Sequence, residues 1–239
     1  MANMLSTENL NEALADAVMD RPREFFIGNR RFCLWSPSLG MSMMLERHIS
    51  ELGINEKFMD MDPAFEALNL STMKKDKVCM IIAIYSFRKF SDLSNSRKLN
   101  SRCSYFQSHL DSKELSQLLL WILSAPRAET LISLSPIGEQ REKQAQIAQI
   151  KKSSNTITFG GTTIYGSLIA PAMSTLHMSY DDVVWGLSLI NLKMLLADSI
   201  NTVTLSEEEA KKYGMISEKS QKIGMSANDF ARLKAEYQD

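Results

Sequence analysis

The chain has 239 residues, of which 44% are apolar, and this length suits two small domains or one elongated helical body better than a single compact core. Its 27 lysine and arginine residues nearly balance 28 aspartate and glutamate residues, so no overall field draws the chain to nucleic acid or to anionic lipid. This balance favours a protein as the partner and makes nucleic acid and membranes poor candidates.

The cellular compartment follows from the cysteines and from the first residues. The three cysteines are widely spaced and form no CxxC pair, which favours reduced thiols. The start of the chain, MANMLSTENL, lacks the basic and apolar regions of a secretion signal. The longest apolar run, residues 78–87, is about half of what a membrane span needs. We therefore expect a cytoplasmic protein.

The first fifty residues predict a helix, a β-hairpin and a second helix. Ser6 is a suitable N-cap for a helix that stops before Arg21-Pro22. Gly28 and Asn29 then separate two aromatic-rich runs, 24–27 and 30–35, and supply the positive φ of a tight turn. The next helix opens at Ser-Pro-Ser, residues 36–38, and ends at Gly53.

Three more helices are expected before residue 126. The first begins at Asp62-Pro63, the second runs from Asp76 to Phe90, and the third is capped by Ser112 and closed by Pro126. Between the second and the third, the serine-rich and basic stretch 91–104 is interpreted as a mobile loop.

A change of composition marks the predicted domain boundary. Residues 138–154 are charged, rich in glutamine and nearly free of large apolar groups. We predict an N-terminal hairpin and helical domain over residues 1–138, a linker over 139–154 and a C-terminal helical domain over 155–239. In the last, short strands at 156–159 and 162–165 flank Gly160-Gly161, and two late helices are capped by Ser206 and Ser226. The predicted fold is mainly α with short β-hairpins (α+β): an N-terminal hairpin, a helical body and a small helical C-terminal unit.

One predicted helix, from Ser179 to Ile200, carries apolar residues on two opposite faces. The first face holds Val183, Val184, Leu187, Ile190, Met194 and Leu195, and the second holds Trp185, Leu189, Leu192 and Leu196. Such a helix needs cover on both sides, from its own domain or from another chain. We take the second face, together with Met41 and Met44, as the candidate protein-interaction surface. Ordinary burial in the core of one domain explains the same pattern equally well.

Motifs that carry chemistry are missing from the sequence. The glycines match no phosphate-binding loop, the three histidines have no paired ligands, and no GxSxG elbow occurs. We therefore expect no catalytic residue, no cofactor, no metal and no enzymatic activity. An enzyme that uses Tyr165, His177 and Asp182 stays as a minor alternative, although the first turn of a helix explains Asp182 better.

Basic residues gather in two stretches of the first half. They are Arg21, Arg23, Arg30 and Arg31, and then Arg88, Lys89, Arg97, Lys98 and Arg102. Tyr105 and Phe106 follow closely and could stack on bases. A nucleic-acid-binding adaptor or regulator that uses the basic 88–102 loop is therefore the alternative function, against the simpler interpretation of these residues as solvated charges.

Two segments resemble bacteriophage and prophage tail assembly chaperones. One is REFFIGNRRFCLWSPSLGMSMMLERHISELGI, residues 23–54, and the other is NTITFGGTTIYGSLIAPAMSTLHMSYDDVVWGLSLINLKMLLAD, residues 155–198, in which YDDVVWG and NLKMLLAD are the recurrent words. The resemblance implies a non-enzymatic, mainly helical protein of the bacterial host cytoplasm. Such a protein self-associates and coats the tape-measure protein, or another tail protein, during phage tail morphogenesis. The family has no shared catalytic motif to carry over.

Overall fold

The computed structural model describes residues 7–150, 161–199 and 204–214, and the statements below concern these ranges. The chain forms two units: unit 1 combines the ranges 1–138 and 159–199, and unit 2 combines 139–158 and 200–239. The described residues are mainly helical with one two-stranded antiparallel hairpin, which confirms the predicted fold class. No helix among them is long and apolar enough to cross a membrane.

Unit 1 begins with the predicted helix, hairpin and helix. Helix α1 (Thr7–Val18) precedes strands β1 (Arg23–Ile27) and β2 (Arg30–Leu34), which pair across the turn at Gly28-Asn29. Gly28 has a φ of 57°, the positive value that the sequence predicted. Helix α2 (Leu39–Leu52) starts at Ser38, whose hydroxyl accepts the Met41 amide, and ends at Gly53 in the left-handed conformation.

The next helices follow the expected order, with α3 (Glu56–Met61) added before α4 (Pro63–Met73). Asp62 caps α4 as predicted, whereas α5 (Lys75–Tyr85) ends five residues earlier than the sequence suggested. Helix α8 (Ser112–Leu123) also exists, but its cap is Asp111 and not Ser112. Asp111 accepts the Glu114 amide, and the Glu114 carboxylate accepts the Asp111 amide in return.

The prediction of a mobile loop at residues 91–104 is wrong. These residues form most of α6 (Phe90–Leu93) and α7 (Ser96–His109). Asn95 caps α7 by accepting the amides of Arg97 and Lys98, and Leu99, Cys103 and Phe106 face the core at helical spacing. Packing against α5 therefore stabilises a segment whose polar composition alone favours a loop.

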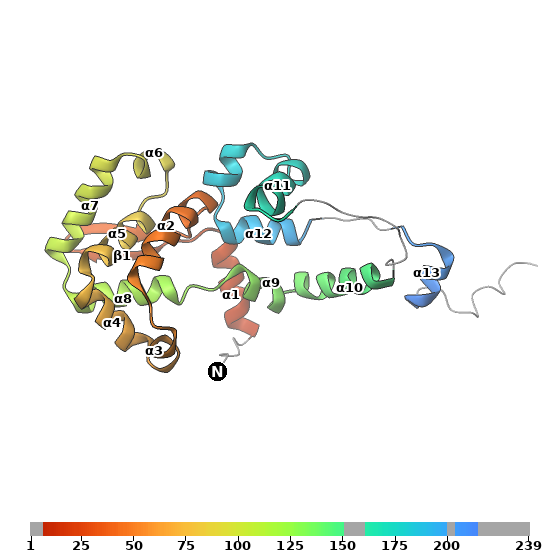
Figure 1. The fold of residues 1–239 in the computed structure, drawn as a ribbon, viewed down its shortest axis with the longest axis horizontal. Helices are drawn as coiled ribbons and strands as arrows, with labels where there is room; N and C mark the ends of the chain where they lie inside the picture. Colours follow the sequence, from red (N-terminus) through yellow and green to blue (C-terminus); the bar gives the residue numbers. More distant parts are fainter. Residues whose placement is uncertain (1–6, 151–160, 200–203, 215–239) are drawn as a thin grey trace, which may run out of the picture. The chain divides into compact units, whose positions relative to one another are not determined.

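The main core of unit 1 lies between the hairpin and helices α2, α4, α5, α7 and α8. Helix α4 packs along α8, and α5 packs against both α2 and α7 (Figure 1). The centre of this core is α5, in which Val78, Cys79, Ile81 and Ile82 are fully buried. A helix apolar on nearly every side is therefore surrounded by neighbours on nearly every side.

A second apolar cluster of unit 1 contains the segment 161–199. Its elements are a π-helical turn η1 (Tyr165–Ile169), α11 (Ala170–Thr175), a second π-helical turn η2 (Asp182–Gly186) and α12 (Leu189–Ala197). Residues 162–165 are not a strand, because 162 and 163 are irregular and Ile164 and Tyr165 are helical. The 156–159 strand prediction lies outside the described residues.

The single helix predicted from Ser179 to Ile200 is interrupted. Leu187 and Ser188 have extended backbone, and Ser188 forms an isolated bridge to Ser38 while its hydroxyl accepts the Asn191 amide and caps α12. The Leu189 amide donates to the Pro37 carbonyl at 2.8 Å. These bonds hold the interruption against the start of α2.

Residues 159–199 belong to unit 1, whereas the sequence placed them in a separate C-terminal domain. Turn η2 contacts α2, and α12 contacts α9 (Ala128–Leu134) and α1. Lys193 of α12 also donates to Glu129 of α9 at 2.5 Å. A long-range contact set of this kind has no local signature in the sequence.

Unit 2 contains most of α10 (Pro136–Ile150) and all of α13 (Glu207–Lys212). Much of the segment predicted as a linker is therefore helical over its described part. Ser206 accepts the Glu209 amide as the predicted cap of α13, and the Glu209 carboxylate accepts the Ser206 amide. The helix predicted at Ser226 lies outside the described residues.

Candidate functional site

The predicted interaction face at Trp185, Leu189, Leu192 and Leu196 is covered within unit 1. Leu192 is fully buried in the second apolar cluster, and Leu189 and Leu196 pack partly buried against it. The Trp185 ring stacks on Phe90 with centroids 4.1 Å apart. In this fold the second apolar face is therefore covered by unit 1 itself, the arrangement that an ordinary core helix has.

The two methionines proposed for the same surface lie on α2. Met41 is buried in the main core, and Met44 is half-buried. The Trp185 indole packs closely against α2, since a Cβ added at Gly40 would lie 2.5 Å from its ring. Trp185 thus seals the junction between the two apolar clusters of unit 1.

The residues of the enzyme alternative lie exposed on one segment. Tyr165, His177 and Asp182 are exposed, and no hydrogen bond or ion pair joins any two of these three described residues. The Asp182 carboxylate instead accepts the Ser179 hydroxyl at 2.6 Å, and the Asp182 amide donates to that hydroxyl at 3.2 Å. This is the geometry of a helix start, as its place in the sequence suggested.

An exposed apolar surface, which the sequence analysis missed, covers the outer sides of α3 and α4. Its members are large apolar side chains that are each at least 41% exposed: Phe58, Met61, Phe65, Leu68 and Met73. The opposite side of α4 holds the buried residues Glu66, Ala67, Leu70 and Ser71 and faces α8. We call the five exposed residues the α3–α4 face.

The α3–α4 face is held in shape by contacts within unit 1. The rings of Phe58 and Phe65 meet edge to face, with centroids 6.4 Å apart. The carboxylate of Glu66, only 2% exposed, accepts the Asn55 amide at 3.0 Å and so ties the start of α3 to α4. Exposed charged residues stand among the apolar ones in the sequence: three acids, Glu56, Asp60 and Asp62, and one base, Lys57. The surface is therefore preorganised, and most of the charges that accompany it are acidic.

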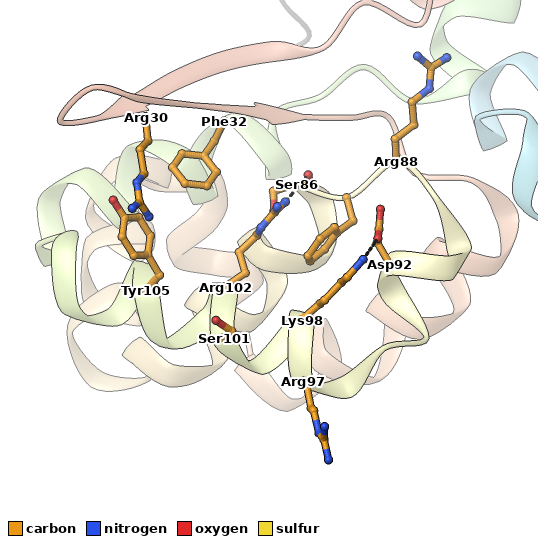
Figure 2. Close-up of a pocket in the computed structure, with 11 residues that line it drawn as sticks. Arg30, Phe32, Ser86, Arg88, Asp92, Arg97, Lys98, Ser101, Arg102 and Tyr105 are labelled. Carbon is orange, nitrogen blue, oxygen red and sulfur yellow. Dashed lines mark hydrogen bonds and ion pairs between the residues drawn. The ribbon is translucent and has the colours of Figure 1, made fainter.

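A basic hollow forms where the hairpin, the end of α5 and helices α6 and α7 meet (Figure 2). Its volume is about 680 Å³. Its described lining holds five basic side chains and one carboxylate, Asp92. The basic residues are Arg30, Arg88, Arg97, Lys98 and Arg102. The fold thus brings Arg30 of the first basic stretch beside most of the second, with helices where a loop was expected.

Arg102 occupies the middle of the basic hollow. Its guanidinium donates to the Ser86 carbonyl at 2.9 Å and to the Ser86 hydroxyl at 3.1 Å. It also lies 3.7 Å from the centre of the Phe87 ring. Burial lowers the pKa of Arg102, and nearby Asp92 partly opposes this effect. An arginine remains charged after a shift of this kind, so Arg102 is a fixed, partly dehydrated cation.

Two further cations lie on either side of Arg102. Lys98 donates to Asp92 at 2.7 Å, and this bond is the main reason that the pKa of the Asp92 carboxyl is lowered. Arg30 lies over the Tyr105 ring, 5.0 Å from its centre. Both interactions are visible in Figure 2 and limit the motion of long side chains that would otherwise move freely.

Arg88 and Arg97 extend away from the other lining residues (Figure 2). Arg88 lies 4.5 Å from the centre of the Trp35 ring and 3.9 Å from the Asp20 carboxylate. Burial raises the pKa of Asp20, and Arg88 opposes that rise. Arg97 is exposed, at the first turn of α7. The inward-facing donors are therefore Arg30, Lys98 and Arg102.

The aromatic lining of the basic hollow is already engaged. Tyr105 stacks with His109 at 4.0 Å in addition to its contact with Arg30. Phe32 packs between Phe25 and Phe106, at 5.5 Å and 5.1 Å. These rings pack against the main core and leave the cationic donors as the part of the hollow that can bind a ligand. Comparisons of the chain with protein-family models, with curated proteins and with solved structures found no match.

Proposed function

We propose that this protein is a non-enzymatic tail assembly chaperone of the bacterial cytoplasm, which self-associates and binds the tape-measure protein during phage tail morphogenesis. The observation that carries the proposal is the α3–α4 face. Five large apolar side chains exposed on adjacent helices are unusual for a chain without partners, and they mark a surface for another protein. The resemblance of residues 23–54 and 155–198 to tail assembly chaperones supplies the partner.

The chemistry of the α3–α4 face suits an amphipathic helix of the client. Phe58, Phe65 and Leu68 would receive its apolar side chains, as in other helix-in-groove contacts. Asp60 and Asp62 would face basic residues beside the apolar ones and would set the orientation. Burial of these side chains would contribute on the order of several kcal/mol before the entropy of association is subtracted.

The experiment is co-expression with a phage tape-measure protein, the long helical client that the resemblance implies. The intact chain is expected to keep this client in the soluble fraction and to co-purify with it. A double variant, Phe65→Glu with Leu68→Glu, should lose both effects by about tenfold or more, because two charges would face the apolar client. Leu134→Glu is the matched control, since Leu134 is 50% exposed on α9, outside the α3–α4 face.

Circular dichroism separates a binding defect from unfolding. Both exposed positions of α4 tolerate a charge without entering the core, so the double variant should keep the helicity of the intact chain. Undiminished client recovery with the folded double variant would refute the α3–α4 face as the binding site. A client that is equally soluble without this protein would refute the chaperone function itself.

A further inference from the structure

We propose that the basic hollow of unit 1 is a binding site for the phosphodiester backbone of nucleic acid, a function beyond the proposed chaperone activity. Its inward-facing donors, Arg30, Lys98 and Arg102, come from β2 and α7 and surround one space of about 680 Å³. One carboxylate, Asp92, accompanies five basic side chains in its described lining, although the whole chain has a formal charge of −1. The positive charge is thus local, and the overall balance of the sequence conceals it.

The donors in the basic hollow are prepared for an oxyanion. The contact of Arg102 with Ser86 uses one guanidinium nitrogen, Nη1, in both of its hydrogen bonds. A guanidinium has five N–H donors, so others remain for phosphate oxygens. Phe87 beneath the group removes water from one side and strengthens its electrostatic interactions. The site therefore binds through fixed charge and hydrogen bonds.

The same geometry opposes recognition through base stacking. The ring nearest to a cation, Phe87, lies against Arg102, and Tyr105 and Phe32 are both packed against neighbouring side chains. A protein that binds single strands by stacking leaves such faces open. We infer contact with the phosphates alone, without dependence on base identity, and Arg88 and Arg97 at the outer edges would meet neighbouring phosphates of the same strand.

The test measures binding of the full chain to a fluorescent 20-nucleotide single strand by anisotropy at several salt concentrations. Arg30→Gln should weaken binding by about three- to tenfold and lower the slope of log K against log salt by about one, the effect of one lost phosphate contact. Arg102→Lys keeps the charge and should also weaken binding, because the planar donor fork is lost. Two oligonucleotides of different base composition should bind equally.

Controls distinguish a site from general attraction. Glu12→Gln lies on α1, outside the hollow, and changes the net charge by one unit, in the direction opposite to that of Arg30→Gln. It should leave the affinity for the strand within about twofold of the intact chain. If inorganic phosphate competes as effectively as unlabelled nucleic acid, the hollow is a site for a small free anion and the proposal is overturned. Equal binding of polyglutamate would show attraction of any polyanion and overturn the proposal. The proposal also fails if folded Arg30→Gln and Arg102→Lys variants bind like the intact chain.

Discussion

Gly40 lies in the first turn of α2, directly against the Trp185 indole. In an open helix, glycine to alanine stabilises by up to about 1 kcal/mol, because glycine has the more flexible unfolded chain. Here the added Cβ would lie 2.5 Å from the indole, and Phe90 stacks on that ring. We therefore expect Gly40→Ala to lower the free energy of unfolding by about 1 to 3 kcal/mol, measured with chemical denaturant.

Gly186→Ala is the control for this prediction. Its added Cβ would meet Asp182 at an ordinary distance of 3.5 Å, so a change within about 1 kcal/mol is expected. A Gly40→Ala protein as stable as the intact chain would mean that Trp185 does not seal this junction.

The buried Tyr85 hydroxyl makes the stability of the fold depend on pH in the alkaline range. Burial raises its pKa from the ordinary value of 10.0 to about 12, so the unfolded chain loses this proton at a lower pH than the folded chain. The resulting stability is fully present below about pH 10 and is lost as the pH rises towards 12. Cys79, whose pKa burial raises from 9.0 to about 12, acts in the same direction.

Tyr85→Phe should therefore lose less stability than the intact chain between pH 10 and 12. Urea unfolding at stepped pH values measures this difference, and below pH 9 the two proteins should run in parallel. Identical losses across the alkaline range would show that the Tyr85 hydroxyl titrates equally in the folded and unfolded chains.

At the scale of elements, α12 tests whether the second apolar face serves a partner or the core. Leu192 is fully buried and Leu189 packs beside it in the same unit. Replacing both with glutamate should cost several kcal/mol and unfold unit 1, because the carboxylates would have no partners in the core. Leu195→Glu is the control, since Leu195 is 46% exposed and should tolerate the charge.

Circular dichroism and light scattering decide between the two roles of α12. Lost helicity in the double variant, with a normal Leu195→Glu protein, is the expected outcome. A fully helical double variant of lower mass would instead restore α12 as an interface between copies.

At the scale of the whole molecule, limited proteolysis tests the connection between the units. Helix α10 exposes Arg141 and Lys143, and its described residues beyond Gly138 bury few apolar groups, so local opening should admit trypsin there. We expect cleavage at Lys151 and Lys152 as well, and these two residues lie outside the described ranges. The fragments should still elute together, because residues 161–199 pack against α2 and α9. Separation of the fragments in plain buffer would contradict this organisation of unit 1. First cleavage within 91–104 would instead contradict the helices α6 and α7 described there.

Local features were predictable because their causes lie within a few residues. The Gly28-Asn29 turn, the Asp62 and Ser206 caps and the Gly53 helix end each depend on backbone angles and hydrogen bonds between near neighbours. The 91–104 segment shows the limit of this reasoning. Asn95 as a cap, with Leu99, Cys103 and Phe106 at helical spacing, was a signal for α7, but serine-rich composition outweighed it.

The sequence by itself determined the mainly helical fold, the hairpin and the caps, because short-range geometry specifies them. The tertiary structure alone decided which apolar faces are covered: Trp185 and Leu192 are enclosed in unit 1, whereas Phe65 and Leu68 stay exposed. It also decided that Arg30 and Arg102, far apart in the chain, line one hollow. Burial and charge convergence depend on contacts between distant segments, and an apolar or basic pattern is the same in the sequence whether or not a neighbour covers it.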